Sequence, residues 1–247
     1  MKTFVPVQRL PAGRGFSSRS VEHEWLDEHQ LDPDELAKVL HDLARFNRAL
    51  IGTFPIFMWL NATLSKRPGD EPLRLLDVGC GNGALLRSIR RWADRRRLDI
   101  ELLGLDANGD AIQIARAASG PGDRISFEIA DVLNFRPSQP IDIIVNSLLA
   151  HHLRDGEIVG LLRWMDGNAR RGWLVCDLHR HPLPYHVIGL AGLVSPIHPL
   201  VISDGKISVR RALTRSEWQS RLDEAGIPRD AAAPRWFLFR WLVGRSR

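Results

Sequence analysis

The stretch Leu75-Leu76-Asp77-Val78-Gly79-Cys80-Gly81-Asn82-Gly83 decides the fold of this chain of 247 residues. A short apolar run ends in an acid and then breaks into three glycines at alternate positions, and a helical pattern begins at Ala84. Glycine adopts torsions that other residues avoid and lets the backbone approach a ligand closely. The stretch therefore predicts a strand, a tight turn and the start of a helix, with a nucleotide-like cofactor lying against bare backbone.

Apolar runs and helical patterns alternate downstream of this turn. Strands are predicted at 73–78, 100–105, 125–130, 141–146 and 173–177, and helices at 84–97, 110–118 and 155–169. Strands that are apolar along their length and alternate with helices are typical of a parallel sheet covered on both faces. We therefore expect an α/β fold with a doubly wound, mostly parallel sheet, and a final strand at Trp236–Val243.

The flanking segments differ from this core. Asp32-Pro33-Asp34-Glu35 predicts a helix start, and a second helix is expected at 54–66, closed by Pro68-Gly69. Near the end, 207–213 is predicted to be a strand or extended segment, and the capping box Thr214-Arg215-Ser216-Glu217 opens a helix that stops at Gly226. We expect a loose tail over 1–30 and one domain over 31–247. Its parts are a helical cap (31–70), a cofactor-binding core (71–180), and a lid insertion with C-terminal strands (181–247).

Composition limits the classes of protein that fit. The formal net charge is +5 and most cations are arginine, which is compatible with nucleic acid binding but also with a solvated surface. The two cysteines, Cys80 and Cys176, predict neither a disulfide framework nor a zinc site. The apolar stretch 185–202 is interrupted by prolines and a histidine, so no membrane span is expected. No signal peptide is predicted either. These features favour a cytoplasmic protein.

Polar residues mark the ends of the predicted strands. Asp106 ends the second, Asp131 the third and Asn146 the fourth. Ligands of open parallel sheets bind at the carboxyl ends of the strands. Gly79-x-Gly81-x-x-Ala84 also fits the dinucleotide-binding pattern, so NAD competes as the ligand. Asp77 argues against it, because a carboxylate repels a pyrophosphate and attracts an ammonium group.

Residues 73–178 resemble a class I S-adenosylmethionine-dependent methyltransferase. The first motif lies at 75–83, the second at 103–107, the adenine-binding motif at 130–132 and the fourth at 141–147. The resemblance implies a Rossmann-like sheet of seven strands with an antiparallel last strand, and S-adenosyl-L-methionine as the cofactor. It implies that Asp77 lies near the methionine ammonium, that Asp106 binds the ribose, and that the remaining contacts come from Gly79, Gly81, Asn82, Ala107, Asp131, Val132 and Asn146.

Candidate acceptor residues follow the fourth and fifth strands. His151 and His152 are the candidate catalytic bases, because a base assists methylation of a hydroxyl group; simple packing is the alternative for both. Arg180 and Tyr185 are candidates for binding the acceptor, although pairing with Asp177 would also explain Arg180. An apolar enclosure is expected from the 180–206 insertion together with Phe54, Phe57, Met58 and Trp59. The sequence has no His-Cys metal-ligand spacing, so no metal is predicted, although a divalent ion bridging a catechol acceptor stays open.

The leading hypothesis is methyl transfer to a small, largely apolar acceptor in secondary metabolism, resembling the quinone-biosynthesis and natural-product branches. O-methylation of a phenolic or polyketide-like hydroxyl comes first and C-methylation second. An RNA methyltransferase is the alternative suggested by Arg90-Arg91 and Arg95-Arg96-Arg97, although the sequence after Asn146 lacks the Asn-Pro-Pro-Tyr pattern, so nucleic acid is disfavoured as a partner. A non-catalytic S-adenosylmethionine-binding protein also stays open, as does a homodimer.

Overall fold

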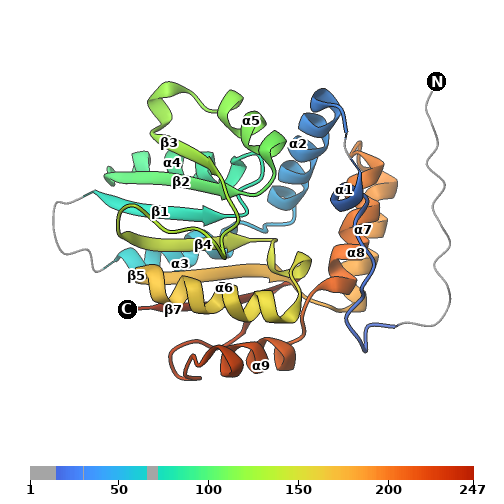
Figure 1. The fold of residues 1–247 in the computed structure, drawn as a ribbon. Coiled ribbons are helices and arrows are strands. Elements are labelled where there is room, and N and C mark those ends of the chain that lie inside the picture. The colour runs from blue at the N-terminus through green and yellow to red at the C-terminus, as the bar shows by residue number, and fades with distance from the viewer. Residues whose placement is uncertain (1–14, 30, 66–71) are drawn as a thin grey trace.

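The computed structural model describes residues 15–29, 31–65 and 72–247. The expected closure at Pro68-Gly69, the end of the second helix at Lys66 and the first part of the expected tail lie outside these residues. Figure 1 shows a central sheet with helices on both faces and a further group of helices beyond one end of the strands.

Seven strands form the sheet in the order β3-β2-β1-β4-β5-β7-β6. The first five are parallel to one another, and β7 runs antiparallel to β5. The order and the direction of the strands confirm the predicted mostly parallel, doubly wound sheet of seven strands. Their bounds are β1 (Leu73–Val78), β2 (Ile100–Asp106), β3 (Ile125–Ile129), β4 (Ile141–Ser147), β5 (Ala169–Leu178), β6 (Arg235–Phe237) and β7 (Arg240–Ser246).

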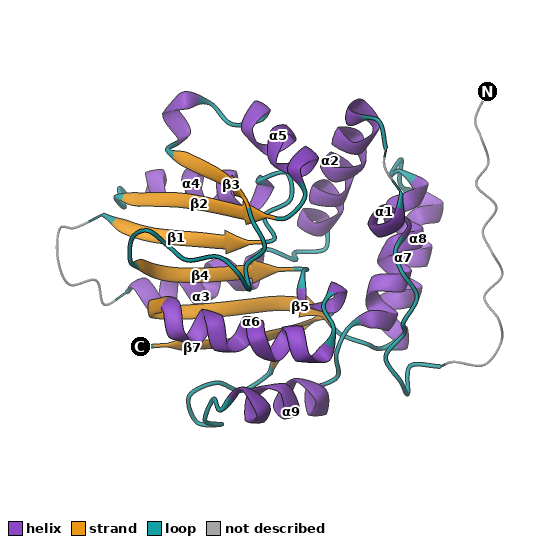
Figure 2. Ribbon diagram, in the orientation of Figure 1, coloured by secondary structure: helices purple, strands orange, loops and turns teal. Residues whose placement is uncertain are grey.

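Helices cover both faces of the sheet, as the purple ribbons of Figure 2 show. Apolar side chains of α6 and α9 pack on one face, and those of α3, α4 and α5 pack on the other. The bounds of the helices are α1 (Trp25–Glu28), α2 (Pro33–Ala49), α3 (Phe54–Leu64), α4 (Ala84–Arg95), α5 (Gly109–Ala117), α6 (Asp155–Asn168), α7 (Pro182–Val194), α8 (Pro199–Arg211) and α9 (Arg215–Ala225).

The remaining helices form a cap beyond the carboxyl ends of the strands (Figure 1). The cap has its own apolar core, which includes Val39 and Phe46 of α2, Ile188 of α7 and Val209 of α8. Asp32 caps α2 as predicted, since its side chain accepts hydrogen bonds from the amides of Asp34 and Glu35. The cap therefore places its own side chains opposite the carboxyl ends of the strands.

Two C-terminal predictions are wrong in detail. Residues 207–211 belong to α8, not to a strand, because Val201 and Val209 lie on one helical face that packs against the rest of the cap. The expected strand 236–243 is a hairpin instead: β6 pairs with β7 across a turn at Leu238 and Phe239. Thr214 and Gly226 do bound α9 as predicted.

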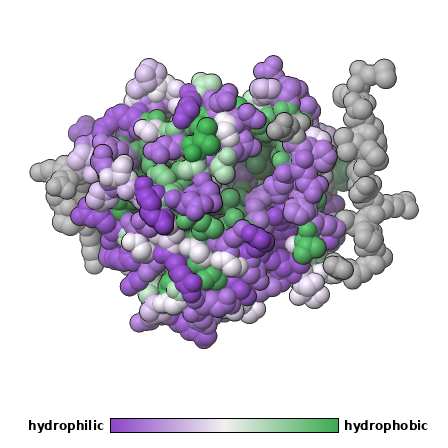
Figure 3. Space-filling model, viewed as in Figure 1, coloured by the Kyte–Doolittle hydropathy of each residue, from purple (hydrophilic) through white to green (hydrophobic). Residues whose placement is uncertain are grey.

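No helix among the described residues is long and apolar enough to cross a membrane. The face drawn in Figure 3 is mostly hydrophilic, with apolar side chains in small groups. This is the ordinary surface of a protein that packs its apolar residues between layers. Both cysteines are free and buried.

Candidate active site

The glycine turn joins β1 to α4 at the carboxyl edge of the sheet. Gly79, Gly81 and Gly83 all have positive φ, at 71°, 52° and 71°. The Gly81 amide donates a hydrogen bond of 2.8 Å to the Asp106 carboxylate, which holds the turn against β2. A Cβ atom at Gly81 would meet no atom within 4 Å. At Gly81 the turn therefore presents bare backbone to open space, whereas a Cβ at Gly83 would meet the Phe127 ring at 2.8 Å.

We expect Gly81→Ala to abolish cofactor binding while costing only about 1 kcal/mol of stability, the strain of a left-handed alanine. The new methyl group would enter the space that the cofactor is predicted to fill. Gly226→Ala is the matched control, because Gly226 also has a positive φ (78°) and open surroundings. Calorimetry with S-adenosylmethionine and thermal unfolding of both variants test this. Equal affinities in the two variants would place the cofactor elsewhere.

Asp77 is a buried carboxyl group next to this turn. It is 2% exposed, and its Oδ1 has no hydrogen-bond partner among the described residues. Burial, together with the nearby Asp106, raises the pKa of Asp77 well above its ordinary value. A buried polar group without a partner is costly, so Asp77 fits a site that is completed by a cationic group of a ligand. Asn146 is also fully buried, and its amide donates to the Val78 carbonyl (2.8 Å), while its Oδ1 has no partner in the part of the chain that the structure describes.

The other predicted cofactor residues surround the same edge of the sheet. Asp106 ends β2, and its second carboxylate oxygen accepts from the Asn108 amide (2.9 Å). Ala107 next to it is exposed. Asn82 lies in the turn itself, where its Oδ1 accepts from the Ala84 amide (3.2 Å).

The adenine-binding pair follows β3. Val132 is buried, whereas Asp131 is exposed and bonded locally to the Leu133 amide and the Asn134 side chain. These local bonds occupy the Asp131 carboxylate in part. Its contact with an adenine ring stays a prediction.

A second cluster centres on His151, in the short 3-10 helix 150–152 that follows β4. His151 Nδ1 lies 2.6 Å from Asp177 Oδ1, and the His151 amide donates to Asp177 Oδ2 (3.1 Å). Burial opposes ionisation of Asp177, but the charge and hydrogen bond of His151 hold the pKa of that carboxyl below its ordinary value. Asp177 thereby favours the tautomer with the proton on Nδ1, which leaves a lone pair on Nε2. The loop that carries His151 is adjacent to the glycine turn, since a Cβ at Gly79 would lie 3.1 Å from the Leu149 side chain.

The N-terminal segment contributes acids to this cluster. Glu24 Oε1 lies 3.6 Å from His151 Nε2, and Asp27 lies 3.2 Å from His152 Nδ1. Residues 15–29 are thus not the loose tail that the sequence suggested, because Glu24 is buried there and α1 packs on the cap. Only contacts distant in sequence reveal these acids, so no local pattern could have identified them.

Glu24, His151 and His152 also offer metal-ligand atoms within 4.8 Å of one another. Carboxylate and imidazole groups are donors that divalent metals accept. Arg211 already lies 3.9 Å from Glu24 and 2.8 Å from Asp27, so a cation balances part of this acidic charge.

We expect Glu24→Gln to flatten the pH dependence of stability. Burial raises the pKa of Glu24 from 4.5 to about 7. A carboxyl group with a raised folded-state pKa contributes stability that is fully present below about pH 4.5 and is lost as the pH rises to about 7. At 1.36 kcal/mol per pKa unit, this loss is roughly 3 kcal/mol. Denaturant unfolding at pH 5 and pH 8 measures it.

The control for that experiment is Glu28→Gln, because Glu28 is exposed on the same segment. It should follow the wild-type pH dependence. If Glu24→Gln also follows it, Glu24 is not the buried acid described above.

Arg180 has a different environment from the one expected. It is 3% exposed, and its guanidinium donates to the Phe16 and Ala212 carbonyls (both 3.0 Å) and to Glu217 (2.6 Å). It pairs with Glu217 and not with Asp177, so it ties the N-terminal segment to α9. Its contact with an acceptor stays a prediction.

The structure separates the other predicted acceptor residues. The Tyr185 ring packs edge-on against Phe16 at 5.5 Å, with Lys206 Nζ 4.6 Å above it. Met58 is 52% exposed on α3. Neither residue lines the pocket described next.

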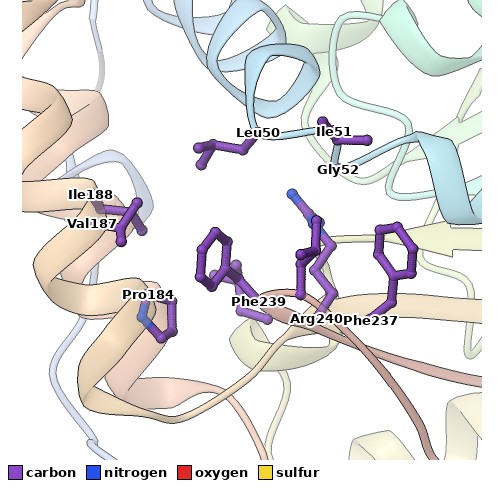
Figure 4. A pocket seen from close by; sticks show the side chains of 11 residues that line it. Leu50, Ile51, Gly52, Pro184, Val187, Ile188, Phe237, Phe239 and Arg240 are labelled. Carbon is purple, nitrogen blue, oxygen red and sulfur yellow. The ribbon is translucent and has the colours of Figure 1, made fainter.

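An apolar pocket lies beyond the end of β5 (Figure 4). Its walls are the loop between α2 and α3, the start of α7 and the β6–β7 hairpin. The insertion lines this pocket as expected, but the loop 50–52 stands where Phe54, Phe57, Met58 and Trp59 were expected, and the hairpin is a wall that the sequence did not reveal. The lining includes Leu50, Val187, Ile188, Phe237, Phe239 and Arg240.

Comparison with known proteins finds methyltransferases similar to part of this chain. Residues 75–172 match the family described as a methyltransferase domain. Trans-aconitate 2-methyltransferase of Streptomyces avermitilis is 36% identical over 122 residues, which is 48% of this chain and 43% of that protein. Ubiquinone biosynthesis O-methyltransferase of Sinorhizobium medicae is 34% identical over 88 residues, which is 34% of this chain and 33% of that protein. Each match therefore covers less than half of the relative.

The fold also agrees with a solved structure. The plantazolicin methyltransferase BamL, in complex with a triazolic desmethylPZN analog and SAH, superposes with a TM-score of 0.60 at 21% identity. The match covers 81% of this chain and 70% of that one. Residues 75–172 therefore resemble a methyltransferase domain, and the chain shares the fold of a solved methyltransferase that holds SAH.

Proposed function

We propose that this chain transfers a methyl group from S-adenosylmethionine to a hydroxyl group of a small, largely apolar acceptor, with His151 as the base. The observation that carries the proposal is the buried pair of Asp177, on β5, and His151, on the loop next to the glycine turn. A histidine oriented by a carboxylate is the usual arrangement for removing a hydroxyl proton.

The cofactor would lie along the carboxyl ends of β1, β2 and β4. In this proposal Asp77 pairs with the methionine ammonium, Gly79 and Gly81 provide backbone contacts, and Asp106 accepts from the ribose hydroxyls. The unpartnered oxygens of Asp77 and Asn146 and the open space over Gly81 support this placement. The remaining expected contacts are those of Asn82, Ala107, Asp131 and Val132.

Bound S-adenosylmethionine supplies a methyl group on a positively charged sulfur. Because methyl transfer is an in-line displacement, the protein must chiefly align the acceptor oxygen with that methyl group. His151 Nε2 would take the hydroxyl proton while Asp177 stabilises the resulting imidazolium, as in other carboxylate–histidine pairs. The apolar body of the acceptor would contact the walls of the apolar pocket beyond the end of β5.

The names of the relatives include O- and N-methyltransferases, so they do not decide which atom is methylated. The test is incubation with methyl-labelled S-adenosylmethionine and a panel of phenols, quinols and polyketide-like hydroxy compounds, followed by mass spectrometry. A labelled methyl ether supports the proposal. A label on ring carbon would establish C-methylation, and label only in added RNA would establish an RNA methyltransferase. Cofactor binding without turnover of any compound would indicate a non-catalytic binding protein.

A further inference from the structure

Arg240, at the start of β7, is a buried arginine that has no carboxylate partner among the described residues. It is 5% exposed. Its Nη2 donates to Asn47 Oδ1 at 3.0 Å, and its side chain also interacts with the buried Cys176 thiol. Its Nη1 is buried and has no hydrogen-bond partner that meets normal geometry among the described residues. The other buried arginines of the described chain each pair with a carboxylate: Arg90 with Asp94, Arg180 with Glu217 and Arg211 with Asp27.

An unpaired buried guanidinium is unfavourable, because burial removes water without supplying a compensating charge. Native proteins leave few such donors unpaired, and those few often mark functional positions. The described part of the chain therefore provides no anion to balance the charge of Arg240, and a bound anionic ligand would do so.

The position of Arg240 indicates where this anion would come from. Figure 4 shows its side chain standing between Phe237 and Phe239, toward Ile51 and Gly52. It is the one charged side chain that lines the pocket within the described chain, and the rest of the lining is apolar or glycine. Because only one cationic side chain lines the pocket, a singly charged carboxylate is favoured over a doubly charged phosphate.

The rim of the pocket has the features of a ligand entrance. Ile51 and Leu238 line it and are about half exposed, and Phe54 beside them packs near Phe237 with a ring distance of 6.0 Å. Ile51 and Leu238 also have positive φ, at 57° and 49°. This backbone conformation is uncommon for residues other than glycine, most of all for the β-branched Ile51, and it is concentrated at functional sites.

We infer that the acceptor of this enzyme carries a carboxylate on an apolar body, and that Arg240 binds this carboxylate while the body lies along the pocket and its rim. To call this ligand the acceptor rests on the proposed function, but binding of a carboxylate by Arg240 does not depend on methyl transfer. Charged hydrogen bonds of this kind are worth about 1.5–3 kcal/mol.

The test compares each carboxylate with its neutral amide of the same shape: benzoate with benzamide, and 3-phenylpropanoate with 3-phenylpropanamide. Affinities are measured by ligand-observed NMR on the full chain without cofactor. We expect the wild type to prefer each carboxylate by about tenfold or more, as that free energy implies. Arg240→Met should bind acid and amide equally, and Arg240→Lys should keep part of the preference.

Arg235→Met is the matched control, because Arg235 is exposed on the same hairpin; it should retain the wild-type preference. Equal binding of acid and amide by the wild type, a preference that survives in Arg240→Met, or no binding of either acid would overturn the inference. Calorimetry with S-adenosylhomocysteine on the same variants separates the two proposals. If the wild type does not bind S-adenosylhomocysteine, the proposed function is refuted but the carboxylate site is not. Arg240→Met should bind S-adenosylhomocysteine with the affinity of the wild type.

Discussion

Replacing His151 by glutamine is expected to lower the methyl-transfer rate by about 10²–10⁴-fold, the usual contribution of a positioned general base. Affinity for S-adenosylmethionine should not change, because the His151 side chain contacts Asp177 and Glu24 and not the glycine turn. The measurement is single-turnover kinetics with an acceptor found in the phenol panel, together with calorimetry for the cofactor.

The neighbouring histidine provides the control. His152 is more exposed and pairs with Asp27, so His152→Gln should keep most of the rate. Asp177→Asn should lose rate as His151→Gln does, because an amide no longer favours the tautomer with a free Nε2. Full activity in His151→Gln would show that the acceptor needs no base or that another group supplies it.

Replacing Asp77 by asparagine is expected to weaken S-adenosylmethionine binding by about 10²-fold or more, since removing one member of a buried charge pair costs 2–5 kcal/mol. The same change should stabilise the free protein, because it removes a buried carboxyl group that lacks a partner. Cofactor affinity and stability would thus change in opposite directions. Calorimetry and denaturant unfolding of the free protein measure the two.

The pH dependence gives a further test of Asp77. Its pKa in the free protein is raised by burial and Asp106, and a bound ammonium would favour the ionised form. Wild-type affinity should therefore fall as the pH drops, and Asp77→Asn should lack this dependence. Asp142→Asn is the control: Asp142 is also buried, but it accepts from the Arg74 amide (3.0 Å) at the opposite end of the sheet. It should lose stability and keep cofactor affinity. If Asp77→Asn does the same, Asp77 is a structural acid.

The core of the fold could be predicted because its signals are local. The run before Gly79 and the alternating glycines specify a strand and a turn within nine residues, and the capping residues Asp32 and Thr214 mark helix starts directly. The strand ends then follow from the topology of a parallel sheet, which brings Asp77, Asp106 and Asn146 to one edge.

The other features of the fold and of the candidate site depend on contacts between segments distant in sequence. The partners Glu24 and His151 are separated by more than half the chain, and Arg240 meets Asn47 across a gap of 193 positions. Residues 207–211 contain β-branched side chains that suit a strand, but packing within the cap makes them helical. Local propensity is a weak guide where tertiary packing decides.

The central claim is that the glycine turn and the acids at the strand ends bind S-adenosylmethionine. A crystal structure with S-adenosylhomocysteine tests it most directly. We expect the amino group of that ligand beside Asp77, its ribose on Asp106 and its backbone contacts at Gly79 and Gly81. Density for the ligand at any other place on the chain, or a protein that does not bind it, would show that these residues do not form a cofactor site.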